Sequence, residues 1–257
     1  MQVDINKKRY PNRSYDALRN IHVAFPVGCT TLIIGTSGAG KSTLIKCMIG
    51  MSSFDGKITD YNREDIAYIP QHPALNQNET ARAAIYWSAL FSRLYRGSHE
   101  LNNAVQHHVQ TMGLQSVQNS EIHNLSGGQR QRVSIAKELI RGKNIIIADE
   151  IDTGLDCGVS RDLVTKLCDI THRTGKTTII ISHNIVNIEL YDRVVVLAKG
   201  SDKTGGIAYA GSPAYIRGFF EVNNYVDILT KINASDEGGM GQADYFIGKF
   251  DSLRSRR

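Results

Sequence analysis

Four short, almost uninterrupted runs of apolar residues constrain the fold of this chain more than any other feature. The runs are TTLIIG, NIIIAD, TTIIIS and RVVVLA, which begin at residues 30, 144, 177 and 193. Strands that read as continuous apolar runs are buried on both faces, which is typical of a parallel sheet covered by helices. Longer amphipathic stretches separate the runs, as in repeated β-α units. The sequence therefore predicts an α/β fold with a mainly parallel central sheet.

The stretch from about residue 78 to 124 follows a helical pattern instead. Its apolar residues recur every three or four positions, for example at Ala84, Trp87 and Phe91, which predicts a helical insert. After residue 220 the pattern weakens, and the glycine-rich stretch 235–242 is typical of a flexible connection. We therefore expect one domain over residues 1–220, with a helical subdomain inserted over about 72–140, and a C-terminal extension or linker over 221–257.

Composition narrows the class of protein without identifying it. The 257 residues are 41% hydrophobic and 21% charged, which is ordinary for a globular protein and excludes a disordered chain. The net charge of +5 is too small for this length to indicate a nucleic-acid partner. The apolar runs are too short to span a membrane, and the polar N-terminal segment lacks the apolar core of a signal peptide. The four scattered cysteines argue against a zinc site and favour a reducing compartment.

Residues 35–43, GTSGAGKST, fit the phosphate-binding pattern G-x-x-x-x-G-K-[ST] between a predicted strand and a predicted helix. In such a loop (P-loop), glycines allow backbone N–H groups to close around phosphate oxygens, and the helix N-terminus favours negative charge. Lys41 would neutralise the terminal phosphates, and Ser42 would bind Mg²⁺. A glycine-rich turn without a ligand is the alternative, which the flanking strand and helix disfavour. The predicted nucleotide-binding residues of this loop are Gly35, Thr36, Ser37, Gly38, Ala39, Gly40, Lys41, Ser42 and Thr43.

Two acidic residues follow the second apolar run. In NIIIADE, Asp149 and Glu150 stand at the carboxyl end of the predicted strand, where α/β proteins bind their ligands. Asp149 suits the coordination of Mg²⁺, and Glu150 is placed to polarise an attacking water. The alternative is a pair of acids that cap a helix start. The P-loop in the same chain favours the catalytic interpretation.

A third motif, LSGGQ at residues 125–129, makes the chain resemble a known family. Ser126 is a good helix N-cap, and glycines at a helix start form an anion site. Together, the three motifs resemble the nucleotide-binding cassette of ATP-binding cassette (ABC) proteins over about residues 1–220. The resemblance implies a P-loop NTPase fold with an N-terminal antiparallel β part. It also implies that the signature grips ATP held by a second cassette in a two-fold, head-to-tail pair. The signature residues are Leu125, Ser126, Gly127, Gly128 and Gln129.

The resemblance assigns roles to further residues. Gln71 in AYIPQHP matches the Q-loop glutamine, which senses Mg²⁺ and the attacking water, and His183 matches the switch histidine that contacts the γ-phosphate. Tyr10 lies where the family has an aromatic residue stacked on adenine, with Tyr15 as a substitute. Catalysis is thus assigned to Glu150, His183 and Gln71, and Mg²⁺ binding to Ser42, Gln71 and Asp149. The D-loop that crosses to the partner subunit matches Thr153, Gly154, Leu155 and Asp156.

The chain departs from the family directly after Glu150. Most cassettes have Pro-Thr there, whereas this chain has Ile151 and Asp152. Asp152 adds a negative charge that we expect near the Mg²⁺ site and the dimer seam, where it would alter the turnover rate. Elsewhere, the stretch that begins with AYIPQHP and the segment that begins with RVVVLA resemble the eye-pigment/G-type exporters and their bacterial relatives.

The predicted function is that of an ABC transporter ATPase. Two cassettes would dimerise around two ATP molecules with Mg²⁺ and drive export through a transmembrane permease, fused or separate. Such a domain is cytoplasmic and peripheral at the cytoplasmic face of the membrane, with no nucleic-acid partner. One alternative is a soluble ABC ATPase that acts on DNA or ribosomes, which the single cassette and the absence of a long insert disfavour. Another is a slow nucleotide-dependent switch, suggested by Ile151 and Asp152.

Overall fold

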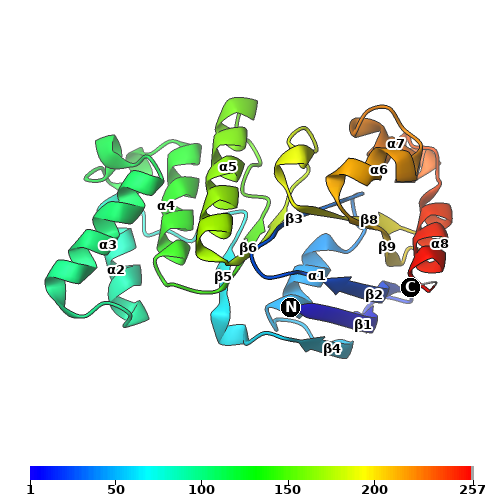
Figure 1. Cartoon of the computed structure of the whole chain (residues 1–257), viewed down its shortest axis with the longest axis horizontal. Helices are drawn as coiled ribbons and strands as arrows, with labels where there is room; N and C mark the ends of the chain where they lie inside the picture. The colour runs from blue at the N-terminus through cyan, green and yellow to red at the C-terminus, as the bar shows by residue number, and fades with distance from the viewer. Residues whose placement is uncertain (256–257) are drawn as a thin grey trace.

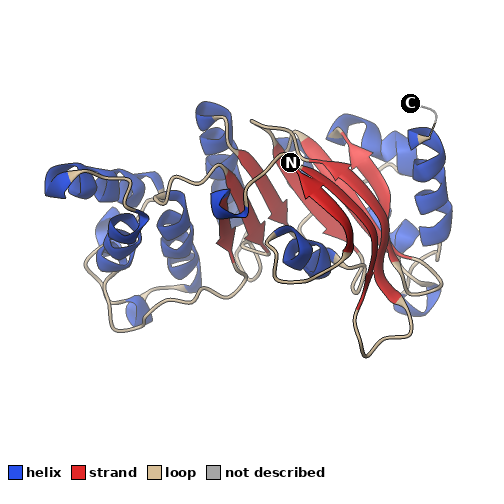
Figure 2. Ribbon diagram, turned by 90° about the horizontal axis from the view of Figure 1, so that it is seen from below, coloured by secondary structure: helices blue, strands red, loops and turns tan. Residues whose placement is uncertain are grey.

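The computed structural model describes residues 1–255, which form one nine-stranded sheet with helices around it. The strand order across the sheet is β4-β1-β2-β9-β8-β3-β7-β6-β5. Figure 2 shows the sheet as a curved layer, with helices beyond one end and beside the other. The strands are β1 (Gln2–Arg9), β2 (Asp16–Ala24), β3 (Thr30–Gly35), β4 (Asp55–Thr59), β5 (Ile66–Ile69), β6 (Ile145–Asp149), β7 (Thr177–Ile181), β8 (Arg193–Lys199) and β9 (Gly205–Gly211).

The centre of the sheet is parallel, as the apolar runs predict. Those four runs form β3, β6, β7 and β8, and β3 pairs in parallel with both β7 and β8. Strands β5 and β6 extend the parallel part, while β1 pairs antiparallel with β2 and with β4. The parallel core and the N-terminal antiparallel part are therefore both confirmed.

The helices occupy three regions of the molecule (Figure 1). Helices α2, α3 and α4 form the helical insert at one end, α6, α7 and α8 lie at the other end, and α1 and α5 flank the sheet between them. None of the helices in residues 1–255 is long and apolar enough to cross a membrane. The helices are α1 (Lys41–Met48), α2 (Ala81–Ser92), α3 (Gly97–Thr111), α4 (Gly127–Leu139), α5 (Cys157–Thr174), α6 (Pro213–Phe220), α7 (Val226–Ile232) and α8 (Ala243–Arg254).

Helical turns of the 3₁₀ type connect several of these elements. They are η1 (Arg63–Asp65), η2 (Gln115–Val117), η3 (Ile122–Asn124), η4 (Ile188–Leu190) and η5 (Ser235–Glu237).

Two hydrophobic clusters cover opposite faces of the central strands. In β3, Leu32 and Ile34 belong to the cluster that contains the core of the helical insert, whereas Ile33 packs with residues of α1, β1 and β2. Successive side chains of a strand point to opposite faces, so a strand buried on both faces needs an apolar residue at every position. This double burial explains why the runs lack the alternation of a half-exposed strand.

The segment after residue 220 is folded onto the sheet. Phe246 of α8 is 1% exposed, and its ring lies 4.7 Å from that of Phe220. The predicted flexible connection, 235–242, folds back onto α7 through backbone hydrogen bonds, including Met240 N to Thr230 O at 2.8 Å and Gln242 N to Lys231 O at 3.0 Å. The domain boundary at residue 220 stays a prediction.

Replacement of Phe246 tests how strongly α8 contributes to folding. Phe246→Ala is expected to lower the free energy of unfolding by about 3–5 kcal/mol, because it removes a fully buried aromatic ring and leaves a cavity. Tyr245→Ala is the matched control, since Tyr245 is 58% exposed on the same helix and its loss should cost less than about 1 kcal/mol. Urea unfolding followed by circular dichroism measures both. Equal stability of Phe246→Ala and the parent chain would contradict the packing of α8.

Candidate active site

The P-loop connects the end of β3 to the start of α1. Gly38 and Gly40 have φ angles of 72° and 95°, which lie in the left-handed region that favours glycine. A Cβ atom at Gly40 would also lie only 2.4 Å from Cδ2 of Leu18. The backbone of the loop therefore depends on glycine at this position, as the motif predicts.

Lys41 is held inside the P-loop by backbone oxygens. Its Nζ donates hydrogen bonds to the carbonyls of Gly35 at 2.8 Å and Thr36 at 3.1 Å. Burial lowers the pKa of Lys41, and the negative charges of Glu150 and Asp149 oppose that shift. The hydroxyl of Thr36 is buried without a hydrogen-bond partner among the described residues. A buried cation and an unsatisfied hydroxyl in one loop fit an anionic ligand such as phosphate.

The P-loop, Glu150 and His183 line one cavity of about 270 Å³. The structure therefore brings together residues that are more than 100 positions apart in the sequence. Arg13, Tyr15 and Lys203 also line this cavity. The sequence motifs give no role to Arg13 or Lys203, because these residues reach the cavity only through the fold.

The three predicted catalytic residues are joined by hydrogen bonds. Gln71 Nε2 donates to Glu150 Oε2 at 2.7 Å, and His183 Nε2 lies 2.9 Å from Glu150 Oε1. Glu150 has a φ angle of 48°, an uncommon conformation for a residue with a side chain, and its N–H donates to the Ile181 carbonyl at 2.9 Å. The turn after β6 thus points the Glu150 carboxylate at the two other side chains.

The predicted Mg²⁺ ligands offer a hydroxyl, an amide and a carboxylate. Hard oxygen ligands of this kind suit Mg²⁺. Burial raises the pKa of Asp149, and its Oδ2 accepts a hydrogen bond from the Tyr68 hydroxyl at 3.2 Å. A cation beside this carboxylate would stabilise its ionised form, so the chemistry of Asp149 suits the ion. Gln71 and Asp149 do not line the P-loop cavity with Ser42, and this set of ligands stays a prediction. Burial, aided by Asp149, also raises the pKa of Tyr68 to about 12, and no motif indicates that residue.

Two tyrosines flank the other side of the P-loop. The Tyr10 hydroxyl lies 3.3 Å from Thr43 Oγ1, and Lys8 Nζ lies 4.7 Å from the centroid of the Tyr10 ring. Tyr15, the predicted substitute, lines the cavity itself, while Tyr10 is not among the residues that line it. The assignment of the adenine-stacking residue to Tyr10 stays a prediction.

One residue of the signature and three of the D-loop line a second cavity of about 270 Å³. Ser126 caps α4 through a reciprocal pair of hydrogen bonds with Gln129. Gly127 lines the second cavity together with Gln71, Glu150 and D-loop residues 153–155, but no P-loop residue lines it. Among the described residues, the signature therefore does not face the P-loop cavity of its own chain.

Asp152 is buried and bonded to Ser182, the residue before His183, and its nearness to the Mg²⁺ site and the dimer seam stays a prediction. Only 7% of the residue is exposed, and its Oδ2 accepts hydrogen bonds from Ser182 Oγ at 2.7 Å and Ser160 Oγ at 3.3 Å. Ser182 Oγ also accepts from the N–H of Asn184 at 2.8 Å. The carboxylate is thus directed into the protein, where hydroxyl donors reach Oδ2, while Oδ1 is buried without a hydrogen-bond partner among the described residues. Asp152 connects the loop after β6 with the loop that carries His183.

Comparison with known proteins gives the same family as the motifs. A family profile described as "ABC transporter" matches residues 18–153. The chain is 29% identical over 231 residues to an ABC transporter ATP-binding/permease protein of Mycobacterium tuberculosis, which covers 85% of this chain and 26% of that protein. It is 28% identical over 262 residues to an ABC transporter G family member of Petunia hybrida, which covers 90% of this chain and 35% of that protein.

A solved structure shares the fold. The chain superposes on cbiO1 of Clostridium perfringens, part of the ABC transporter complex cbiONQ, with a TM-score of 0.72 and 25% identity, covering 84% of this chain and 90% of that one. The chain thus matches nearly all of an isolated cassette, but spans only about a quarter to a third of the two longer relatives.

The hydrogen bonds of Asp152 make a prediction for stability. Asp152→Ala is expected to lower the free energy of unfolding by about 1–3 kcal/mol, because it leaves two buried serine hydroxyls without their acceptor. Asp152→Asn should lower the free energy of unfolding by less, since the asparagine amide oxygen still accepts one of these hydrogen bonds. Urea unfolding measures both variants. If Asp152→Ala is as stable as the parent chain, the inward position of Asp152 is wrong.

Proposed function

Because the chain belongs to the ABC transporter family, we propose that it is the ATP-hydrolysing part of a transporter that works as a pair of cassettes. ATPase domains of this family bind ATP with Mg²⁺. The observation that carries the proposal for this chain is the single cavity that contains the P-loop, Glu150 and His183, with Gln71 bonded to Glu150.

ATP would bind with its phosphates in the P-loop. Backbone N–H groups of the loop and the N-terminus of α1 would surround the phosphate oxygens. Lys41 would exchange its two carbonyl partners for phosphate oxygens, which suit its charge better. Ser42, Gln71 and Asp149 would hold Mg²⁺, which neutralises part of the phosphate charge.

Hydrolysis would use Glu150 as the base. A water positioned by the Glu150 carboxylate attacks the γ-phosphorus and gives a proton to that carboxylate, while the bond from phosphorus to the bridging oxygen breaks and ADP leaves. His183, now bonded to Glu150 Oε1, would donate instead to a γ-phosphate oxygen. This exchange of partners leaves Glu150 Oε1 available to the water, and it makes the base depend on the presence of nucleotide.

The site requires a second cassette. The signature lies on a cavity that no P-loop residue lines, so its anion-binding helix start has no ATP within its own chain. A two-fold, head-to-tail pair would bring each signature onto the ATP of the other chain and satisfy both sites at once. A homodimer is the simplest such pair.

A transmembrane permease would bind the helical insert. A cavity of about 490 Å³ opens there, lined by Trp87, Phe91 and Leu94 beside charged residues of α4. Trp87 is 47% exposed and Phe91 76% exposed, and grouped exposed apolar side chains mark interaction sites. The domain would then sit at the cytoplasmic face of the membrane.

The permease would be either part of the same protein or a separate chain, and the Mycobacterium relative, an ATP-binding/permease protein, supports the fused arrangement. Export stays a prediction from the resemblance to G-type exporters.

Substitution of the base tests hydrolysis. Glu150→Gln should still bind ATP but hydrolyse it at least about 100-fold more slowly, because the amide cannot accept the proton of the attacking water. The variant should also accumulate an ATP-bound dimer, which light scattering detects, while phosphate release measures turnover. Glu64→Gln, an exposed substitution on η1, is the matched control. Unchanged turnover in Glu150→Gln would exclude Glu150 as the base.

Substitution of the P-loop lysine tests nucleotide binding. Lys41→Ala should raise the Kd for ATP by about 10-fold or more, because it removes a charge-assisted contact with the phosphates. Lys57→Ala, on the exposed surface of β4, should leave the Kd unchanged. Titration calorimetry gives both values. Equal affinities of Lys41→Ala and the parent chain would contradict the P-loop assignment.

A further inference from the structure

The loop between β8 and β9 brings an unassigned cation to the nucleotide cavity. Lys203 lines this cavity together with P-loop residues and His183, and the Lys203 side chain belongs to an exposed residue. Its φ angle is 67°, and its N–H donates to the carbonyl of Gly200 at 2.9 Å. This tight turn therefore fixes the backbone position from which the Lys203 side chain extends.

Both ends of this loop pack against the P-loop. A Cβ atom at Gly205 would lie only 2.2 Å from the carbonyl oxygen of Ala39, and one at Gly38 would lie 3.6 Å from Cδ of Lys199. The close approach at Gly205 leaves no space for a side chain between β9 and the P-loop. Residues 200–204 are therefore supported at both ends by the segment that binds phosphate.

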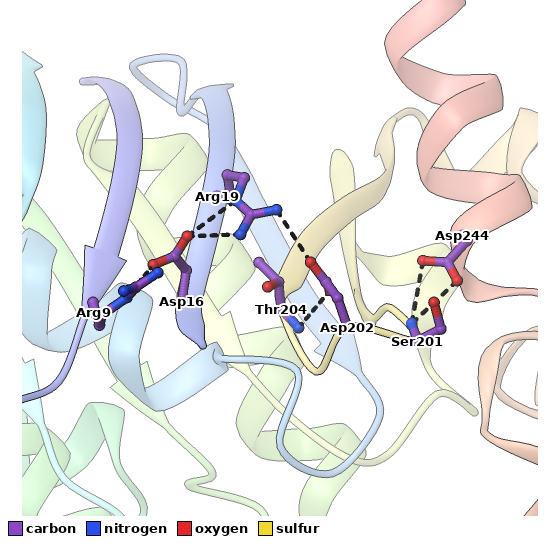
Figure 3. Close-up of polar contacts among 7 residues, drawn as sticks. All are labelled: Arg9, Asp16, Arg19, Ser201, Asp202, Thr204 and Asp244. Atoms are coloured by element: carbon purple, nitrogen blue, oxygen red, sulfur yellow. Dashed lines mark hydrogen bonds and ion pairs between the residues drawn. The ribbon is translucent and has the colours of Figure 1, made fainter. Parts of the chain in front are cut away.

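Two carboxylates fix the middle of the loop (Figure 3). Asp202 accepts hydrogen bonds from Thr204 N at 2.9 Å and from Arg19 Nη1 at 3.1 Å. Asp244, in the first turn of α8, accepts from Ser201 N at 3.1 Å. The hydrogen bond from the Thr204 backbone and the charge of Arg19 lower the pKa of Asp202, so this carboxylate is ionised at neutral pH.

These contacts extend to β1 and to the C-terminal segment. Arg19 is held by Asp16, which also accepts from Arg9 Nε at 2.7 Å. On the other side, Lys199 Nζ lies 3.5 Å from Glu237 of η5. Within the loop, Asp202 is thus attached to β2 through Arg19, and Ser201 is attached to α8 through Asp244. A loop held in this way presents its lysine at a defined place.

We propose that Lys203 is a further ATP-binding residue that contacts the terminal phosphates, and that Asp202 and Asp244 are positioning residues for its loop. This inference rests on the proposed function, because it assumes that ATP occupies the P-loop cavity. Lys41, Arg13 and Lys203 face that cavity from three elements, and the carboxylate of Glu150 is bonded to Gln71 and His183. A polyanionic ligand in the cavity would therefore be attracted by a third cationic side chain, that of Lys203.

The affinity for ATP tests the assignment. Lys203→Ala should raise the Kd for ATP by about two- to five-fold, the range expected for a solvent-exposed ion pair. Lys203→Arg should retain the affinity, because it keeps the charge. Lys57→Ala is the matched control and should not change the Kd. Added salt should weaken ATP binding less in Lys203→Ala than in the parent chain, since fewer charges are left to screen.

A comparison of ATP with AMP tests which phosphates Lys203 contacts. Lys203→Ala should weaken the binding of ATP more than that of AMP, if the lysine contacts the terminal phosphates. Equal losses for ATP and AMP would overturn the contact with the terminal phosphates.

The role of α8 is tested with a double-mutant cycle. Asp244→Asn should weaken ATP binding by less than Lys203→Ala does, and it should add no further loss in the Lys203→Ala background, because it acts through that lysine. Independent, additive losses would overturn the positioning role of Asp244. Thermal unfolding of each variant checks that the chain remains folded.

The outcomes separate this inference from the proposed function. If the parent chain binds ATP, Lys41→Ala weakens that binding and Lys203→Ala does not, the function stands and the role of Lys203 is wrong. If neither the parent chain nor Lys41→Ala binds ATP, the proposed function itself fails.

Discussion

The parallel pairing of β3, β6 and β7 is the constraint on which the rest of the structure depends. Asp149 of β6 lies opposite Ile181 of β7, and Ile181 lies opposite Ile33 of β3. Because parallel strands end at the same edge, the residues that follow them meet there: the P-loop after β3, Glu150 after β6 and His183 after β7. One shift in register would separate these groups, and the close packing of individual side chains on both faces of the strands opposes such a shift. The hydrophobic core therefore aligns the polar site.

Much of this arrangement could be predicted from the sequence, because its signals are local. The β-branched runs identify the central strands, and the P-loop and LSGGQ motifs are continuous stretches of chain. The positions of Lys203 and Tyr68 could not be predicted in this way, since each reaches the site through pairing between distant strands. Leu18 and Gly205, for example, form the contact of β2 with β9 across most of the sequence. The inward direction of the Asp152 side chain could not be predicted either, because its partners Ser160 and Ser182 lie on separate segments of the chain.

The arrangement of Glu150 suggests how hydrolysis is coupled to binding. In the structure, each carboxylate oxygen of Glu150 has a partner. Oε2 accepts a hydrogen bond from Gln71, and Oε1 lies within hydrogen-bond distance of His183 Nε2. Neither side chain is adjacent to Glu150 in the sequence, and each lies on a separate loop. As the proposed base, Glu150 with both oxygens engaged would be poorly available to water. Rearrangement of either loop would release one oxygen, so activation and loop movement would occur together.

The contact between Phe220 and Phe246 has a consequence for how this protein is divided experimentally. The predicted domain boundary lies at residue 220, yet a cut there would expose the Phe220 ring and remove Asp244 from the β8–β9 loop and Glu237 from Lys199 at the end of β8. A fragment that ends at residue 220 would contain every named motif and still lack part of the support of the β8–β9 loop. Loss of solubility or of nucleotide affinity in such a fragment would reflect a missing structural layer rather than a missing motif.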